Sequence, residues 1–166
     1  HNVKGAPVNP LSEELEITHA YLTIQKMRFA DRVNILESVR ENVRSLLVPK
    51  LVLQPLVENA ICHGIEPKTG PGTIYIGARV DGQQLLVSVY DDGVGIEEET
   101  LHQLQQALEQ PAARAQELPH VGILNVHRRI RLTYGQDYGL SLNSTLGEGT
   151  QVTLHLPILT KEEETR

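Results

Sequence analysis

The chain has 166 residues and is poor in several residue types, with one cysteine, one methionine, one phenylalanine and no tryptophan. A single cysteine excludes a disulfide within the chain and is typical of a reducing compartment such as the cytosol. With so few large aromatic side chains, leucine, isoleucine and valine must build most of the core. Hydrophobic residues make up 40% and charged residues 22%, so the length and composition fit one soluble globular domain.

Four longer patterns are also absent. No run of lysine and arginine occurs and the formal net charge is −6, so we expect no nucleic-acid partner. No apolar stretch approaches the roughly 20 residues that a membrane-spanning helix needs, and no signal-peptide pattern is visible. No segment of the form G-x-x-x-x-G-K-S/T occurs, which excludes a Walker-type nucleotide site.

The hydrophobic pattern predicts a mixed domain of helices and strands. Apolar residues at helical spacing predict helices over 12–29, 51–63, 97–109 and 122–134, the first capped by Ser12. Alternating, β-branched segments predict strands over 33–39, 73–80, 84–90, 138–144 and 150–157, and Asp81-Gly82 predicts a hairpin. Because paired strands alternate with helices, we expect an α+β fold: a two-layer α/β sandwich with a mixed, mostly antiparallel sheet and helices on one face.

The domain boundaries are predicted from the composition at the two ends. Residues 1–10 contain two prolines and a glycine and predict a linker, residues 11–159 predict a single domain, and residues 160–166 predict a charged tail. The first helix either packs on this domain or continues as an arm into a segment outside the sequence, and the pattern leaves both open. Because the chain starts at His1 without methionine, we expect a piece of a longer protein.

The segment LQPLVENAICHG, residues 53–64, holds the strongest chemical signal. Neighbours at i and i+4 share a helix face, so Asn59 and His63 are expected to point the same way, with Gly64 ending the helix. Asn59 lies in an otherwise apolar helix, and a partly buried amide needs partners. Mg²⁺ with its waters and phosphate oxygens would supply them. The alternative is an ordinary solvated pair of Asn59 and Glu58.

Three glycine-bearing turns follow this segment in order: DDGVG (91–95), VGILN (121–125) and GEGT (147–150). Asp91 is placed to accept a hydrogen bond from an exocyclic amine, and Gly93 and Gly95 would let the backbone lie against a flat ring. Gly122 precedes a helix start, where free N–H groups favour phosphate. Each turn alone is equally well an ordinary strand end or hairpin loop. The order and spacing of all four segments together indicate a magnesium–nucleotide site.

In this order and spacing the sequence resembles the GHKL (Bergerat) ATP-binding fold, which sensor histidine kinases share with type II topoisomerase ATPases, Hsp90 and MutL. The closer resemblance is to the LytS/YehU-type sensor histidine kinases. That subfamily shows a helix like EELEITHAYLTIQKMRF, then LQPLVENA-x-x-HG, and an N-V-x-x-R pattern like NVHRR. The resemblance covers about residues 11–157, nearly the whole chain.

The resemblance implies an ATP-binding catalytic domain of a two-component histidine kinase. Such a domain transfers the γ-phosphoryl group of ATP to a histidine on an upstream dimerisation and phosphoacceptor domain, for relay to a response regulator. The implied ligands are ATP and Mg²⁺. The implied parent protein is a homodimer anchored in the bacterial cell membrane, with this domain on the cytoplasmic side. The resemblance leaves open whether the domain by itself is a monomer.

The resemblance also assigns residues to roles. Asn59 would bind Mg²⁺ and, with Glu58, act in catalysis, while Asp91 would read the adenine amine. The other residues that it places at the nucleotide are His63, Gly93, Gly95, Ile96, Gly122, Leu124, Asn125, Arg129, Gly147, Gly149 and Thr150. Residues 97–120 would form a lid that the nucleotide orders.

The sequence departs from the family pattern at several positions. Cys62 stands where relatives often carry lysine, and His120 takes the place of the first glycine of the second glycine box. No P-H-F-L-x-N phosphoacceptor segment occurs, and His19 and His127, on predicted helices, are expected at the surface. The loss of the cation at Cys62 is expected to weaken phosphate binding unless Arg128 or Arg129 compensates, and His120 is expected to stiffen the end of the lid and lower the affinity.

Pro55 bears on the type of reaction. The related ATPases place a water-activating glutamate four residues before the motif asparagine, and that position is Pro55 here. Its lack of a base disfavours free hydrolysis and favours transfer to a histidine. Two alternatives stay open: an ATPase or serine kinase of the same fold, and a degenerate, non-catalytic interaction module.

Overall fold

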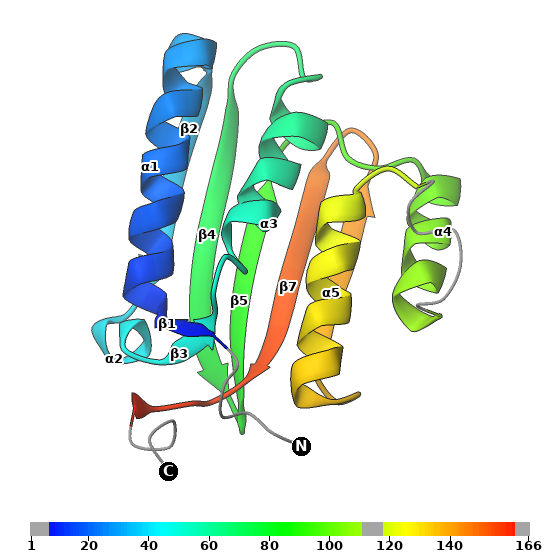
Figure 1. Ribbon diagram of the computed structural model, residues 1–166. Coiled ribbons are helices and arrows are strands. Elements are labelled where there is room, and N and C mark those ends of the chain that lie inside the picture. The colour runs from blue at the N-terminus through cyan, green and yellow to red at the C-terminus, as the bar shows by residue number, and fades with distance from the viewer. Residues whose placement is uncertain (1–6, 111–117, 162–166) are drawn as a thin grey trace.

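The central sheet buries one face because the side chains of its strands alternate in direction. The computed structural model describes residues 7–110 and 118–161, and within these ranges the main sheet has five strands in the order β2-β4-β5-β7-β6 (Figure 1). They are β2 (Val33–Val39), β4 (Gly72–Asp81), β5 (Gln84–Asp91), β6 (Gly139–Thr145) and β7 (Gly149–Pro157). β2 pairs with β4 in parallel and the other neighbours are antiparallel, which confirms the predicted mixed sheet.

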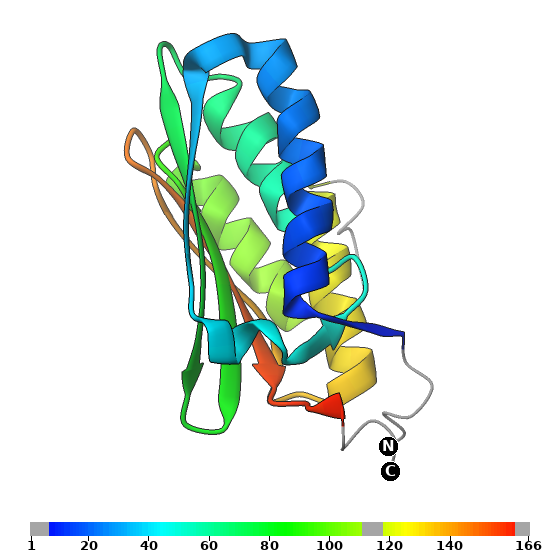
Figure 2. The ribbon, with the colours of Figure 1, turned by 90° about the vertical axis from the view of Figure 1, so that its left-hand side faces the viewer.

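Helices cover one face of this sheet and leave the other face open, as the side view shows (Figure 2). They are α1 (Leu11–Phe29), α3 (Gln54–Asn59), α4 (Glu98–Glu109) and α5 (Val121–Tyr134). Leucine, isoleucine and valine side chains from both layers form the core, as the composition predicts. The predicted two-layer α/β fold is therefore confirmed. No helix in the described ranges has the length and apolar character needed to cross a membrane.

A smaller sheet joins β1 (Val8–Pro10) to β3 (Leu47–Pro49). Residues 8–10 fall in the segment assigned to a linker, so ordered structure begins earlier than the composition predicts. β3 and the one-turn helix α2 (Glu41–Arg44) escape prediction because so few residues show no period. Residues 1–6 and 162–166 lie outside the described residues, so the rest of the linker and most of the charged tail stay predictions.

Helix α1 packs on the domain, which is one of the two arrangements that its pattern allows. Its buried apolar side chains are Leu11, Leu15, Leu22 and Phe29. The predicted cap at Ser12 is wrong, because α1 begins at Leu11 directly after β1 and has no side-chain cap. The N–H of Leu11 instead donates to the carbonyl oxygen of Leu46 at 2.8 Å, so a tertiary contact replaces the cap.

The helix of the LQPLVENAICHG motif differs from the predicted helix over 51–63. Leu51 has a positive φ of 58°, which interrupts the helix, and α3 begins only at Gln54. The helix then continues as a π-helix, η2 (Ala60–Ile65), so Gly64 lies inside the helix and does not end it. π-Helices are rare and frequently occur at functional sites.

Glu14 of α1 fixes the start of this helix. The carboxylate is 1% exposed and accepts hydrogen bonds from the N–H groups of Leu51 at 3.1 Å and Val52 at 3.0 Å. Asn9 of β1 donates a third at 2.8 Å. These bonds satisfy the buried charge and hold the positive-φ turn at Leu51, so α1 fixes where the motif helix begins.

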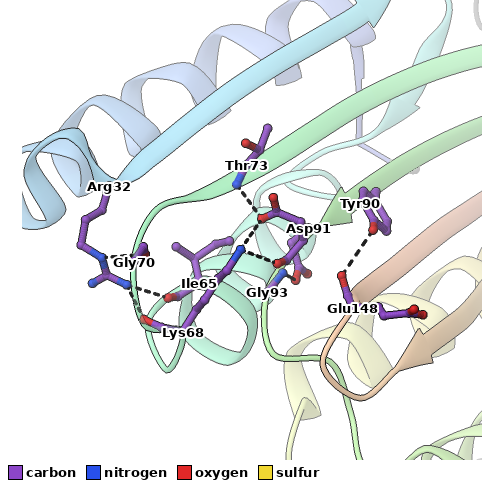
Figure 3. A network of polar contacts seen from close by, with 10 residues as sticks. Arg32, Ile65, Lys68, Gly70, Thr73, Tyr90, Asp91, Gly93 and Glu148 are labelled. Carbon is purple, nitrogen blue, oxygen red and sulfur yellow. Dashed lines mark hydrogen bonds and ion pairs between the residues drawn. The ribbon is translucent and has the colours of Figure 1, made fainter.

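Arg32, just after α1, holds the other end of the same helix. Its guanidinium donates to the carbonyl oxygens of Ile65 at 3.1 Å, Lys68 at 2.7 Å and Gly70 at 3.2 Å (Figure 3). A positive side chain is favourable at the negative, C-terminal end of a helix. The segment that follows α1 therefore fixes the motif helix at its C-terminal end, which the sequence pattern does not reveal.

His127 is buried, so the expected surface position is wrong. It is 3% exposed on α5, where its Nε2–H donates to the carbonyl oxygen of Leu108 at 2.7 Å and its Nδ1 accepts from the N–H of Leu140 at 2.9 Å. Burial lowers the pKa of the imidazole, although the hydrogen bond to Leu108 opposes the shift. Neutral His127 thereby links α4, α5 and β6.

Replacing His127 with leucine is expected to lower the free energy of unfolding by about 2–4 kcal/mol near neutral pH, because two buried backbone groups lose their partners. The folded pKa lies below the unfolded value of about 6.5, so the folded state binds fewer protons and this contribution is lost as the pH falls. In urea unfolding, the stability difference from wild type should shrink as the pH falls from about 7.5 to 5. The exposed His102→Leu is the control. If the difference in the free energy of unfolding between His127→Leu and wild type did not change with pH, this role of His127 would be contradicted.

Candidate nucleotide-binding site

The motif helix and the first glycine turn meet at the end of β5. Asp91 is the last residue of β5, and its Oδ1 accepts a hydrogen bond of 2.9 Å from the N–H of Gly93. A side chain at Gly64 would overlap the Asp91 carboxylate, and one at Gly93 would overlap the backbone of Gly64. Val94 N–H also donates to Gly64 O at 3.1 Å. Gly64 is therefore a site residue that sequence reasoning mistook for a helix end.

The GEGT turn lies on the other side of Asp91. Thr150 is directly opposite Asp91 in the β5–β7 register, and both side chains are buried. A side chain at Gly149 would overlap the carbonyl oxygen of Asp91, and the N–H of Gly147 donates to Val94 O at 2.7 Å. The structure thus brings together two glycine turns that lie more than fifty residues apart in the sequence.

Gly95 and Ile96 lead from the DDGVG turn toward α4. The N–H of Ile96 donates to Ser144 Oγ at 2.8 Å, and the same hydroxyl lies 2.8 Å from Thr150 Oγ1. Ile96 is 6% exposed, so its side chain belongs to the core, and Gly95 adopts a φ of +74°. These bonds connect the DDGVG turn to the β6–β7 hairpin, so the backbone on both sides of Asp91 is held in place.

The Asp91 carboxyl group is buried and has a raised pKa, and one of its oxygens can accept a further hydrogen bond. It is 2% exposed, and burial raises its pKa to about 6 even though the bond from Gly93 opposes the shift. Within the described part of the chain no residue hydrogen bonds to its second oxygen, Oδ2. Oδ2 is not enclosed by the protein, because the enclosed side-chain atoms without a partner among the described residues are the hydroxyl oxygens of Thr18 and Tyr134, so a ligand donor can reach it. The exocyclic amine of adenine is a donor of this kind, so the cradle fits the predicted role.

A polar network links the segment after α1 with Asp92, the residue next to Asp91 (Figure 3). Lys68 Nζ donates to the carbonyl oxygen of Asp92 at 2.9 Å, and Asp92 Oδ1 accepts from the N–H of Thr73 at 2.7 Å. Arg32 holds the carbonyl oxygen of Lys68. This chain of contacts connects the end of α1 with the residue beside Asp91. Lys68 and Arg32 carry no motif signal in the sequence.

Replacing Gly93 with alanine is expected to lower the free energy of unfolding by about 2–4 kcal/mol or to prevent folding, because the new methyl group overlaps fixed backbone. Gly122→Ala is the matched contrast, since nothing lies within 4 Å of a methyl group there. It should leave stability unchanged or slightly raised but weaken nucleotide binding, because the methyl group enters the space in front of α5. Urea unfolding and calorimetric titration with Mg·ADP separate the two effects; equal stability losses would contradict this assignment.

Asn59 is buried and its side-chain oxygen is already in contact with a histidine. His120 Nδ1 lies 2.6 Å from Asn59 Oδ1, and each residue is 8% exposed. Because an amide oxygen only accepts, the Nδ1–H of His120 is the donor. The His63 ring stacks on His120 with centroids 4.0 Å apart, so Asn59 and His63 share a face as predicted. Burial and, to a smaller extent, the neighbouring His63 together lower the pKa of His120 to about 4.

Glu58 lies on a different side of the motif helix from Asn59. Gln54 Nε2 donates to its Oε1 at 2.8 Å, and its charge contributes to raising the pKa of Cys62 and of Tyr21 on α1, after the larger effect of burial. Cys62 is exposed. Glu58 therefore faces the surface between the motif helix and α1, next to the metal position but not directed at it.

Helix α5 begins beside this cluster. Gly122 and Asn125 are exposed in its first turns, whereas Leu124 is 2% exposed and packs in the core. Only the backbone of Leu124 is thus available to a phosphate, and its N–H lies 3.4 Å from His120 O. Arg129 is exposed about 10 Å further along the helix axis. Of the predicted lid, residues 111–117 lie outside the described residues.

Two grooves lie apart from the Asp91 carboxylate, although the second of them borders the DDGVG turn at Ile96. One of about 590 Å³ runs over the open face of the sheet beside Arg40 and Arg79, and one of about 1070 Å³ lies between the start of α4 and the β6–β7 hairpin. Neither is lined by Asn59, Asp91 or Gly122. The cluster around Asp91 remains the better candidate, because it alone combines a buried carboxylate with a shifted pKa and closely packed glycine turns.

The residues of the cluster fit a nucleotide with a hard metal ion. Among the described residues no group of three or more His, Cys, Asp or Glu side chains is placed to hold a metal. Mg²⁺ needs no such group, since it keeps waters and phosphate oxygens and takes only one or two protein oxygens. Asn59 offers one such oxygen, and the free N–H groups at the start of α5 suit phosphate.

Comparison with known proteins agrees with this geometry. The family model described as "Histidine kinase-, DNA gyrase B-, and HSP90-like ATPase" matches residues 47–160. Sensor histidine kinase YesM of Bacillus subtilis is 35% identical over 147 residues, which are 89% of this chain and 23% of that protein. Sensor protein LytS of Bacillus cereus is 30% identical over 98% of this chain and 27% of its own length. The chain thus spans about a quarter of the curated relatives that it matches.

A solved structure agrees at the level of the fold. The catalytic domain of histidine kinase ThkA superposes with a TM-score of 0.63 and 22% identity, covering 95% of this chain and 97% of that one. The relatives named as sensor histidine kinases, LytS among them, confirm the predicted resemblance. The chain therefore belongs to the family of histidine kinase-, DNA gyrase B- and HSP90-like ATPases.

Proposed function

We propose that this chain is the catalytic domain of a sensor histidine kinase, which binds Mg·ATP and transfers the γ-phosphoryl group to a histidine of an acceptor domain. The observation that carries the proposal is the cradle of Asp91. A buried carboxylate, with one oxygen that accepts no hydrogen bond within the described residues, lies between Gly64, Gly93 and Gly149.

Each residue has a task that its position supports. Asp91 would orient adenine, the first turn of α5 would receive the phosphates, and Asn59 would hold the metal through its side-chain oxygen. Bound Mg²⁺ would neutralise phosphate charge during the transfer. A neutral imidazole is already a nucleophile, so the domain has mainly to position the two reactants. Glu58, beside Asn59 at the surface, would orient the incoming histidine.

Pro55 favours transfer over hydrolysis. It occupies the first turn of α3, one helical turn before Asn59, where it suits the helix start and carries no base to activate water. An ATPase would need such a base at this point. The contact of His120 with Asn59 favours the other alternative, a degenerate domain, because it occupies the expected metal ligand.

Incubation with γ-labelled ATP and a separately added acceptor domain tests the proposal. We expect the label to move to a histidine of the acceptor, as a bond that is labile in acid and stable in alkali. Steady phosphate release without acceptor would instead indicate an ATPase, and label on serine would indicate a serine kinase. Failure to bind Mg·ATP in calorimetry would leave only the degenerate module.

The relatives extend the proposal to the parent protein. Because they are sensor kinases about four times longer than this chain, we infer that the parent is a homodimer in the cell membrane with a response regulator as its phosphoryl acceptor. Size-exclusion chromatography of the parent tests the dimer, cell fractionation tests the membrane location, and phosphoryl relay to candidate regulators tests the partner.

A further inference from the structure

We infer that His120 competes with the metal ion for Asn59, so that Mg·ATP binds only when the imidazole leaves the amide oxygen. The inference rests on the proposed function, because it takes Asn59 as the metal ligand. It concerns a residue at which the sequence departs from the family's glycine.

The space at Asn59 Oδ1 holds either the His120 ring or a hydrated metal ion, but not both. The 2.6 Å between His120 Nδ1 and Asn59 Oδ1 places an N–H dipole, positive end first, at the oxygen that a cation needs. Both residues are 8% exposed, so the ring fills the space around that oxygen and leaves little for a metal with its waters. Mg²⁺ demands a nearly complete octahedral shell and gives up its waters reluctantly. The ring and the hydrated ion therefore exclude each other.

The backbone makes the departure of His120 feasible. Its φ of 66° and ψ of 29° are left-handed values, which glycine adopts freely and which a histidine adopts only under constraint. The constraint consists of the bond to Asn59 and the stacking on His63 at 4.0 Å. His120 directly precedes Val121, the first residue of α5, and rotation about its side-chain bonds moves the ring while its carbonyl oxygen stays with the N–H of Leu124. A ligand that takes Asn59 removes one of the two constraints.

Calorimetric titration with the imido analogue of ATP tests the competition, in the presence of Mg²⁺ and in the presence of a chelator. His120→Ala and His120→Gly are both expected to bind the magnesium complex about tenfold more tightly than wild type, while metal-free affinity changes less than about threefold. The exposed His19→Ala is the control and should behave as wild type. Alanine and glycine together separate the loss of the ring from the relief of the backbone.

Several results would overturn the inference. If only His120→Gly gained affinity, the effect would come from the backbone. If both variants gained affinity equally with and without metal, the His120 ring would be crowding the nucleotide and not competing with the metal. Weaker binding in both variants would make His120 a nucleotide contact. If neither wild type nor the variants bind the magnesium complex, the proposed function and this inference fail together. If all of them bind it and the His120 variants gain no affinity, only the inference fails.

The contact can also be examined without nucleotide. In nitrogen-15 NMR of the histidine rings, Asn59→Ala should shift the Nδ1 signal of His120 and expose its proton to exchange, while His19→Ala leaves it unchanged. An unaltered His120 signal in Asn59→Ala would show that the bond does not form, and the inference would fail whatever the nucleotide does.

Discussion

Asn59→Ala is expected to weaken Mg-dependent nucleotide binding by about 100-fold or more, a loss of roughly 2.7 kcal/mol, and to abolish phosphoryl transfer. The described residues offer no cluster of acidic or imidazole side chains that would substitute for the missing oxygen. Asn59→Asp should fail as well, although it keeps an oxygen, because a carboxylate accepts the Nδ1–H of His120 in a stronger bond than an amide does and adds a negative charge beside the phosphates. Titration with Mg·ADP, with and without chelator, measures the effect.

The variant should remain folded, which keeps the result interpretable. Asn59 is buried, but among the described residues its only side-chain hydrogen-bond partner is His120, and that ring still packs on His63. The exposed Asn34→Ala on the edge strand β2 is the matched control and should bind as wild type does. A folded Asn59→Ala protein that keeps full metal-dependent binding would show that the motif helix has been assigned wrongly.

The motif spacing predicts the site better than the local rules predict the helix that carries it. Asp91, Gly93 and Gly149 come together as their turns imply, because β5 and β7 are neighbours in a sheet whose strands the alternation pattern predicts well. The start of the motif helix is wrong by three residues because Leu51 adopts a left-handed conformation. Glu14, 37 residues away, stabilises that conformation, and no local rule contains such a contact.

The errors at histidines have the same origin. His127 reads as a surface residue because polar residues surround it in sequence, yet two backbone partners on α4 and β6 make it a core residue. His120 is predicted to be a stiff replacement for glycine, and the sequence pattern does not reveal its contact with Asn59, sixty-one residues earlier. Arg32 escapes notice because its three acceptors are backbone carbonyls, which have no sequence identity to match. The sequence pattern therefore does not predict polar contacts between residues that lie far apart in the chain.

Asp91→Asn is expected to weaken binding of adenine nucleotides by about 30- to 100-fold, while making the nucleotide-free protein more stable. The binding loss follows from the chemistry of the free oxygen: an asparagine amide turned toward the ligand presents a donor to the adenine amine, which is itself a donor. Calorimetric titration with ADP measures this part. The exposed Asp81→Asn, at the far end of β4, is the control and should leave binding unchanged.

The stability gain follows from the pKa of Asp91, which burial raises from 3.8 to about 6. Because the folded state binds the proton more tightly than the unfolded state does, wild-type stability falls as the pH rises through this range, and the ionised carboxylate destabilises the fold above it. Asparagine carries no charge, so its advantage should be absent near pH 4 and reach roughly 1–3 kcal/mol at neutral pH in urea unfolding. If the advantage does not grow with pH, the buried charge is compensated within the protein itself. If it grows but binding is unchanged, the base is read elsewhere. A charge kept at a cost in stability, beside glycines that leave one oxygen open, is understandable only if a ligand supplies the missing donor.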